Sequence, residues 1–187
     1  MLCGWAFRFK SLSDGQWQIL NFLLPGDFIG LQDRLAEVSP VGVEALVEAR
    51  LCAFPMPGLW PVFSRFPSLG FDITWLAAHE EGSVDEGMLT VGRRTATERV
   101  AMLMLHLHKR AVAVGMGCEG TVPFPVCQHQ IADALGLSLV HTNRTVRKLQ
   151  RNGLCSIEDG QLRLPNPKAL ERLADFYERP PPQRSLE

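Results

Sequence analysis

The chain has 187 residues, of which 46% are hydrophobic and 21% are charged, and its formal net charge is −1. This balance is that of an ordinary globular protein, and it excludes a disordered chain, a membrane protein and a polycation. Because the net charge is close to zero, any binding of nucleic acid must depend on positive charge concentrated in one region. No run approaches the roughly 18 consecutive apolar residues that cross a bilayer, so we expect no membrane partner.

The cysteines indicate a reducing compartment. They are scattered and odd in number, and no two of them form a C-x-x-C pair. Dispersed thiols of this kind are typical of a cytosolic protein, and the N-terminus lacks the layout of a signal peptide. We therefore predict a cytoplasmic protein whose thiols stay reduced. The cysteines are Cys3, Cys52, Cys118, Cys127 and Cys155.

Residues 1–66 are predicted to form a small antiparallel β-domain. Short segments alternate between apolar and polar residues, and no helical period of useful length appears in the first strands. Tight turns are indicated at Ser13-Asp14-Gly15 and at Pro25-Gly26-Asp27. The predicted strands are Trp5–Lys10, Gln16–Leu24, Val43–Val47 and Arg50–Phe54, followed by a short helix at Leu59–Phe66.

A long helix is predicted over residues 67–92. Its apolar residues recur at spacings of 3, 4 and 7, which favours packing along a second helix, such as that of a partner chain. The alternative is that it packs only on its own domain. Gly82 and Gly87 lie inside it at a cost of about 1 kcal/mol each relative to alanine, and Gly92 is expected to end it. The predicted dimer residues are Leu69, Ile73, Leu76, Ala77, Val84, Met88 and Val91.

The next helix is predicted to begin at Thr95. The sequence Thr95-Ala96-Thr97-Glu98 has the form of a capping box, in which the first and last side chains each accept a hydrogen bond from a free backbone amide. This helix is expected to bury Val100, Leu103, Met104 and Leu107.

Residues 128–150 are predicted to form a helix, a tight turn and a second helix. Gly136 and Leu137 supply the turn, and Ser138 is placed to cap the second helix. The spacing of apolar residues predicts which sides pack inward. These are Ile131, Ala132 and Leu135 in the first helix, and Leu139, Thr142, Val146 and Leu149 in the second.

One flank of this second helix collects positive charge, and no acidic residue occurs between Ser138 and Ile157. A flank of full cations fits a major groove that is lined by phosphates and base edges. The alternative is an ordinary solvated face, which is what arginine and lysine on a helix usually form. The flank contains His141, Arg144, Lys148 and Arg151, with Val140, Asn143 and Arg147 beside them.

A β-hairpin is predicted directly after the charged helix. Gly153 ends the helix, and Asp159-Gly160 is a two-residue hairpin signal between Leu154–Glu158 and Gln161–Leu164. Helix, turn, helix and hairpin together predict a winged helix-turn-helix, which argues against the solvated-face alternative. A last helix is expected at Pro167–Tyr177.

Three motifs, LLPGDFIGL, GRRTATERVA and IADALGLSLVHTNRTVRKLQRNGL, occur in this order and resemble those of the Crp/Fnr family of bacterial transcription regulators. The resemblance covers nearly the whole chain. It implies an α+β fold with a partial antiparallel β-roll, or jelly roll, of the cyclic-nucleotide-binding type (1–66), a long dimerisation helix (67–92) and a winged helix-turn-helix DNA-binding domain (93–187). It also implies a homodimer on a pseudo-palindromic operator in double-stranded DNA, a signal at the roll relayed through a hinge at Gly92, and contact with RNA polymerase.

The resemblance further implies roles for individual residues in DNA binding. Val140, Asn143 and Arg144 match the positions that read bases in the family, and Arg144 would bind a guanine with two hydrogen bonds. The remaining polar and cationic residues around the helix would contact phosphates. These are Gln128, His129, Ser138, His141, Arg147, Lys148, Arg151 and Arg163.

Three departures from the family pattern limit what carries over. The strands that normally precede Trp5–Lys10 are missing, so we expect a misassigned start, a fragment or an unusually short roll. Leu31 stands at the acidic ribose contact and Pro40-Val41 at the Arg-Ser phosphate pair, so we predict no tight binding of cyclic AMP and no other cofactor. Val140 replaces a common glutamate, so the usual half-site is not expected.

A metal site is not predicted. The pairs His106-x-His108 and Cys127-x-His129 have residues two apart, and on a helix such residues point to nearly opposite sides and cannot share an ion. Nothing specific supports a haem bound through His79 or a cysteine.

Enzymatic activity is not predicted either. The carboxylates of Glu80-Glu81 and Asp85-Glu86 are better explained by a solvated helix face than by acid–base catalysis. No phosphate-binding glycine loop and no nucleophile elbow occurs. Two other functions stay open: a winged helix that binds protein, and a small-molecule sensor whose DNA binding is vestigial.

Overall fold

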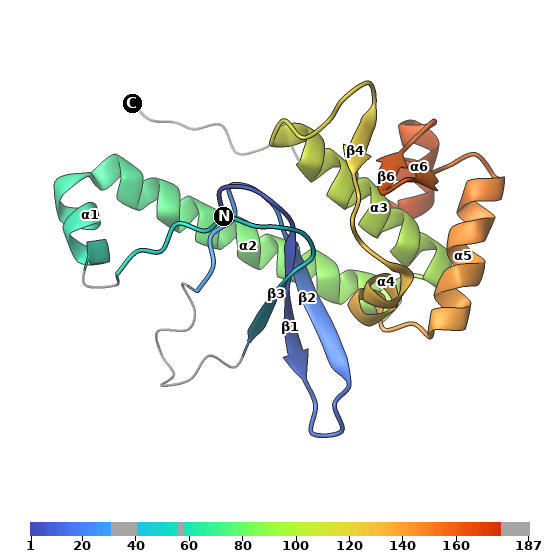
Figure 1. Ribbon diagram of the computed structural model, residues 1–187, viewed down its shortest axis with the longest axis horizontal. Helices are drawn as coiled ribbons and strands as arrows, with labels where there is room; N and C mark the ends of the chain where they lie inside the picture. Colours follow the sequence, from blue (N-terminus) through green and yellow to red (C-terminus); the bar gives the residue numbers. More distant parts are fainter. Residues whose placement is uncertain (31–40, 56–57, 177–187) are drawn as a thin grey trace.

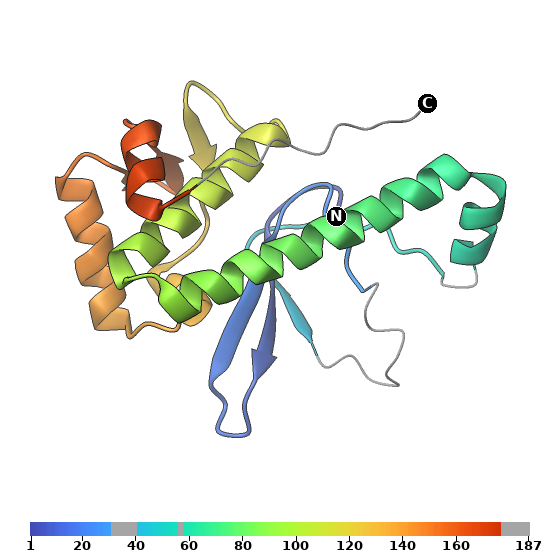
Figure 2. The ribbon, with the colours of Figure 1, turned by 180° about the vertical axis from the view of Figure 1, so that it is seen from behind.

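The computed structural model describes residues 1–30, 41–55 and 58–176. One long helix, α2 (Pro67–Arg93), runs along the molecule from the short helix α1 (Leu59–Arg65) to the C-terminal domain (Figure 1). Seen from behind, α2 crosses over the N-terminal strands (Figure 2). Over these ranges, no helix combines the length and hydropathy needed to cross a bilayer. Leu31 and Pro40, which bear on cyclic AMP, lie outside the described residues.

The N-terminal part contains a three-stranded antiparallel sheet in the order β2-β1-β3. Phe7 of β1 pairs with Phe22 of β2, and both side chains are buried, as the alternating pattern predicts. The register between these strands shifts between Arg8 and Phe9, which marks a bulge. The strands are β1 (Ala6–Ser11), β2 (Trp17–Leu23) and β3 (Gly42–Ala45).

The strand predicted at Arg50–Phe54 is wrong. Arg50 forms an isolated bridge with Cys3, through hydrogen bonds Leu2 N to Arg50 O (2.8 Å) and Arg50 N to Cys3 O (3.1 Å). The residues that follow Arg50 have no strand beside them in the described part of the chain, so an apolar pattern without a partner edge does not form a ladder.

The expectation that Gly92 ends the long helix is also wrong, because α2 continues to Arg93. The helix ends where Arg94 becomes extended, with ψ 147°. A glycine costs a helix only about 1 kcal/mol, and Arg94 is held by hydrogen bonds that fix the end of the helix one residue later. The proposed hinge at Gly92 therefore lies inside the last turn of α2, and its role stays a prediction.

The C-terminal part is a winged helix-turn-helix packed on α3 (Ala96–Ala113). The predicted capping box at its start is confirmed: Glu98 accepts from Thr95 N at 2.8 Å, and Glu98 N donates to the Thr95 hydroxyl at 3.5 Å. A second antiparallel sheet has the order β4-β6-β5. The remaining elements are β4 (Thr121–Pro123), α4 (Gln128–Leu135), α5 (Leu139–Arg151), β5 (Ser156–Glu158), β6 (Gln161–Arg163) and α6 (Pro167–Ala174).

One hydrophobic core joins the two parts. Trp5 and Phe22 from the N-terminal sheet belong to the same buried cluster as Met104 of α3 and Leu149 of α5. The shared core means that the sheet and the winged domain form one packed unit within this chain.

The last helix, α6, ends at Ala174, three residues before the predicted end at Tyr177. It ends there because Asp175 adopts a left-handed conformation with φ 53°.

Candidate nucleic-acid interface

Helices α4 and α5 are joined by the predicted tight turn. Gly136 adopts a left-handed conformation with φ 61°. Leu137 N donates to Ala132 O at 3.1 Å, and this bond closes the end of α4. Ser138 then caps α5, because its hydroxyl accepts a hydrogen bond from His141 N at 3.3 Å, as expected of an N-cap serine. These local bonds fix where α5 begins and in which direction it runs.

The inward face of α5 differs from the predicted face at two residues. Thr142, Val146 and Leu149 are buried as expected, but Thr145 is buried as well, whereas Leu139 is only half-buried. Leu139 is the first residue of the helix, so it lies at the edge of the contact with α4. Burial of the inward side leaves the opposite side of α5 facing solvent.

The outward side of α5 forms an open groove. Val140, with 78% of its surface exposed, lies at one end, and Arg144 and Arg147 follow along the helix. Asn143 is half-buried at the edge of this surface. Gln150 also lines the groove, although the sequence pattern did not single it out. Its place one turn beyond Arg147 could have been found from helical spacing alone.

The cations of this surface are free to meet a ligand. None of them makes an ion pair or a hydrogen bond through its side chain within the described ranges, and the ion pairs present there involve other residues. The surface is therefore positive, and no carboxylate in the described part of the chain neutralises it. The exposed cations are Arg144, Arg147, Lys148, Arg151 and Arg163.

The wing is a two-residue hairpin, as predicted. Asp159 and Gly160 have φ 50° and 70°, the pair of positive values that a type I′ turn requires. Arg163 lies exposed on β6, and Gln128 and His129 are exposed in the first turn of α4. Ser138 and His141 are exposed at the start of α5. All predicted DNA-contacting residues thus belong to α4, to β6 or to α5 and its cap, and their individual roles remain predictions.

Comparisons with known proteins agree with this geometry. Residues 98–173 match the family of the Crp-like helix-turn-helix domain. The chain is 35% identical over 166 residues to the nitrogen fixation regulation protein FixK of Bradyrhizobium diazoefficiens, and the match covers 89% of this chain and 69% of FixK. It is 30% identical over 171 residues to the transcriptional activatory protein AadR of Rhodopseudomonas palustris, and that match covers 91% of this chain and 70% of AadR.

The chain belongs to the Crp/Fnr family of transcription regulators. The structure of FixK2 from Bradyrhizobium japonicum matches it with a TM-score of 0.81 at 27% identity, covering 96% of this chain and 86% of that chain. The predicted family and the predicted α+β fold class are thereby confirmed.

Two arginines at the junction position the DNA-binding domain of this Crp/Fnr protein, and the sequence pattern predicted a role for neither of them. Arg94 is buried and donates to Ala174 O at 3.0 Å and to the Thr90 hydroxyl at 2.6 Å. Arg99 donates to Leu135 O at 3.0 Å, at the C-terminal end of α4. A cation in the first turn of a helix opposes the helix dipole, so Arg99 could have been recognised as a residue with a specific partner.

The N-terminal sheet also bonds directly to the winged domain. Arg110 of α3 forms an ion pair with Asp27, in the turn after β2, and donates to Phe22 O at 2.8 Å. Gln18 of β2 donates to Ala134 O near the end of α4 at 3.2 Å. The sheet is therefore linked both to the support helix α3 and to the first helix of the DNA-binding motif.

Two of the acidic residues on α2 are not simply solvated, which corrects the interpretation from sequence. Glu80 pairs with Arg8 of β1 at 3.3 Å, and Glu86 pairs with Arg94 at 2.6 Å. They tie α2 to the sheet and to the junction, so they serve structure. Among the residues that the structure describes, no group of three or more metal-binding side chains occurs.

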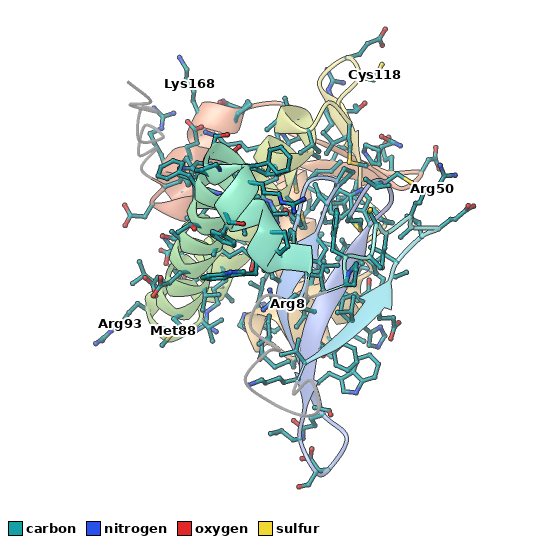
Figure 3. The ribbon with its side chains drawn as sticks, turned by 90° about the vertical axis from the view of Figure 1, so that its left-hand side faces the viewer. Arg8, Arg50, Met88, Arg93, Cys118 and Lys168 are labelled. Atoms are coloured by element: carbon teal, nitrogen blue, oxygen red, sulfur yellow. The ribbon has the colours of Figure 1, made fainter. Side chains whose placement is uncertain are left out.

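The predicted dimer stripe on α2 is partly exposed. Met88, with 71% of its surface exposed, projects from the C-terminal half of α2 near Arg93 (Figure 3). Leu69, Ile73 and Leu76, by contrast, line an apolar pocket together with residues from α1 and the N-terminal part of the same chain. Part of the stripe therefore faces its own domain. Val84 and Val91 are also exposed, at 48% and 37%.

Proposed function

We propose that the protein is a homodimeric regulator that binds a pseudo-palindromic operator and places one α5 helix in each of two successive major grooves. The observation that supports this most strongly is the free cationic surface of α5, held outward by a packed α4 and followed by a wing. Dimers of this motif bind half-sites about one helical turn, roughly 34 Å, apart. As a DNA-binding regulator it would act in the cytoplasm.

Within each half-site we assign two kinds of contact. Val140, Asn143 and Arg144 read bases, because they lie on the outward side near the start of α5, the part of a recognition helix that meets base edges. Lys148 and Arg151, one and two turns further along, contact phosphates. The other proposed phosphate contacts are Gln128, His129, Ser138, His141, Arg147 and Arg163.

Dimerisation through α2 is proposed from its exposed apolar residues. Met88 is 71% exposed and Val84 is 48% exposed in the single chain. Apolar surface of this kind is costly in water unless a partner covers it. A signal at the N-terminal sheet would change how two α2 helices pack and would reorient the winged domains through Arg94 and Arg110. RNA polymerase is the proposed protein partner, and tight cyclic AMP binding is not expected.

The test is selection of binding sites from random duplex DNA by the purified protein, followed by affinity measurements over a range of salt. We expect a pseudo-palindrome and an affinity that falls steeply with salt, with a slope of about 0.9 per phosphate neutralised. Arg151→Ala should flatten that slope, whereas Arg50→Ala, an exposed arginine of the N-terminal part (Figure 3), should not. No affinity, or an affinity insensitive to salt, would instead favour a winged helix that binds protein.

A further inference from the structure

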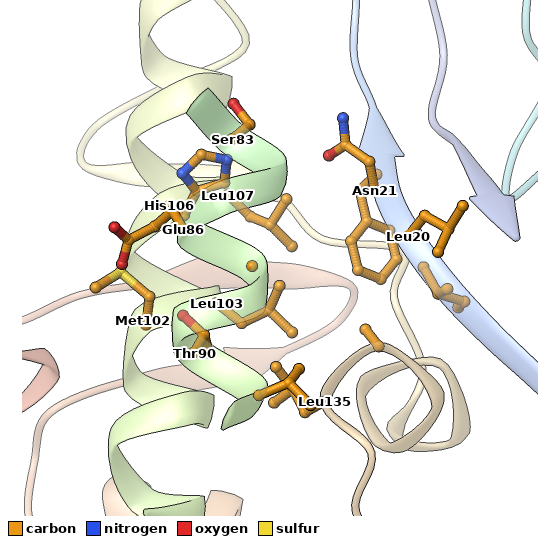
Figure 4. Close-up of a pocket in the computed structure, with 15 residues that line it drawn as sticks. Leu20, Asn21, Ser83, Glu86, Thr90, Met102, Leu103, His106, Leu107 and Leu135 are labelled. Atoms are coloured by element: carbon orange, nitrogen blue, oxygen red, sulfur yellow. The ribbon is translucent and has the colours of Figure 1, made fainter. Parts of the chain in front are cut away.

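A cavity lies where the N-terminal sheet meets the DNA-binding domain. Its walls come from β2, α2, α3 and α4, and Figure 4 shows their side chains around it. The cavity has a volume of about 100 Å³, of the same order as the roughly 150 Å³ apolar cavity that holds benzene in another protein. Phe22, Leu103, Leu107 and Leu135 supply much of the apolar wall.

His106 of α3 is a polar residue of the cavity wall. Its ring makes no hydrogen bond within residues 1–30, 41–55 and 58–176, and it lines the cavity beside α2 (Figure 4). The other polar side chains of the wall each contact a neighbouring residue. Asn21 accepts from Arg110 at 3.4 Å, Ser83 donates to His79 O at 3.1 Å, and Glu86 and Thr90 each contact Arg94 at 2.6 Å.

The surroundings of His106 keep its ring uncharged. Burial, then the charge of Arg110 and then His79 lower its pKa from 6.5 to about 4. A neutral imidazole offers one N–H donor and one acceptor nitrogen. The His106 side chain is half-buried, and a ligand that bonds to its ring would place that hydrogen bond against an apolar wall, where it is stronger than in water. An uncharged ligand fits better than an ion, because an apolar wall would strip the ion of its water.

We propose that this cavity binds a small uncharged molecule about the size of phenol. Its apolar body would pack against Phe22, Leu103 and Leu107, and its single hydroxyl, or an equivalent group, would bond to the ring of His106. Because the walls belong to both parts of the chain, occupancy would alter how the N-terminal sheet holds α3 and α4. That regulatory consequence rests on the proposed DNA-binding function, whereas the binding itself does not.

The chain offers a matched pair of variants for the test. Gly87 lines the cavity and Gly82 does not, yet both are helical glycines of α2 at which an added Cβ meets nothing within 4 Å. Leucine at either position improves helix propensity by a similar amount. Gly87→Leu should therefore fill the cavity, and Gly82→Leu should leave it open, without either variant unfolding the protein.

The experiment titrates the full chain with phenol in the absence of DNA and monitors binding through the NMR signals of the His106 ring. A second titration uses benzene in place of phenol. We expect saturable phenol binding with a Kd on the order of 1 mM or below in the wild type and in Gly82→Leu. Phenol should bind at least tenfold more weakly to Gly87→Leu, and benzene should bind more weakly than phenol to the wild type.

Absence of saturable phenol binding, equal binding by both leucine variants, or benzene binding as tightly as phenol would overturn the proposal. Operator affinity is measured separately on the same samples. A protein that binds phenol as expected but no DNA would contradict the proposed function and leave the cavity assignment standing. A protein that binds its operator but not phenol would contradict the cavity assignment and leave the proposed function standing.

Discussion

Arg94 is the residue whose removal should most damage the junction between α2 and the winged domain. Its guanidinium donates to the Thr90 hydroxyl, to Ala174 O and, at 3.4 Å, to Asp175 O, so it connects α2 to the end of α6. It also pairs with Glu86 at 2.6 Å. Truncation to alanine would leave two of these acceptors, the Thr90 hydroxyl and Ala174 O, buried without their donor.

The size of the effect follows from the burial of these groups. The Arg94 side chain is 8% exposed, whereas that of Glu86 is 43% exposed. Each of the two short hydrogen bonds from Arg94 to buried acceptors should therefore contribute roughly 1.5–3 kcal/mol. Solvent screening makes the share of Glu86 in the ion pair small. Arg94→Ala is expected to lower the free energy of unfolding by about 3–5 kcal/mol.

Urea denaturation followed by circular dichroism measures this change. Arg93→Ala is the matched control, because Arg93 is the neighbouring residue and is exposed. Replacement of an exposed side chain of this kind should alter stability by about 0.5 kcal/mol or less. If Arg94→Ala is as mild as Arg93→Ala, the assignment of Arg94 as the structural link at this junction is refuted.

Two further predictions concern single buried side chains. Thr142 is fully buried and its hydroxyl has no hydrogen-bond partner in the described part of the chain. Thr142→Val should therefore raise the free energy of unfolding by about 1 kcal/mol, measured by thermal denaturation, and a decrease would contradict this. The folded pKa of His106 is about 4, below its ordinary 6.5, so the unfolded chain takes up the proton first as pH falls. As the pH is lowered from 6.5 to about 4, the free energy of unfolding should decrease by at most about 3 kcal/mol. His106→Gln should remove this part of the pH dependence, and an unchanged slope would contradict the prediction.

Features set by neighbouring residues were predicted well from the sequence. The capping box at Thr95, the cap at Ser138 and the hairpin at Asp159-Gly160 each depend on side chains and backbone within a few residues of one another. The same holds for the outward face of α5, because burial of Thr142 and Val146 follows from helical spacing. The family resemblance then supplied the order of the domains.

Features set by distant residues could not be predicted in this way. The partners of Arg94, Arg99 and Arg110 lie on elements far along the chain, and spacing along a helix carries no information about them. The end of α2 was misplaced at Gly92 for the same reason, since hydrogen bonds from Arg94 outweigh a small loss of helix propensity. The cavity beside His106 exists only because four separate elements meet there.

The most direct test of the account compares Arg144→Ala with Lys148→Ala on the selected operator and on random DNA over a range of salt. We predict that Arg144→Ala weakens operator binding by about 1–3 kcal/mol and relaxes the preference at one base pair. Lys148→Ala should weaken binding to both DNAs alike and reduce the salt slope by about 1. Identical behaviour of the two variants on operator and random DNA would contradict the assignment of α5 as a recognition helix.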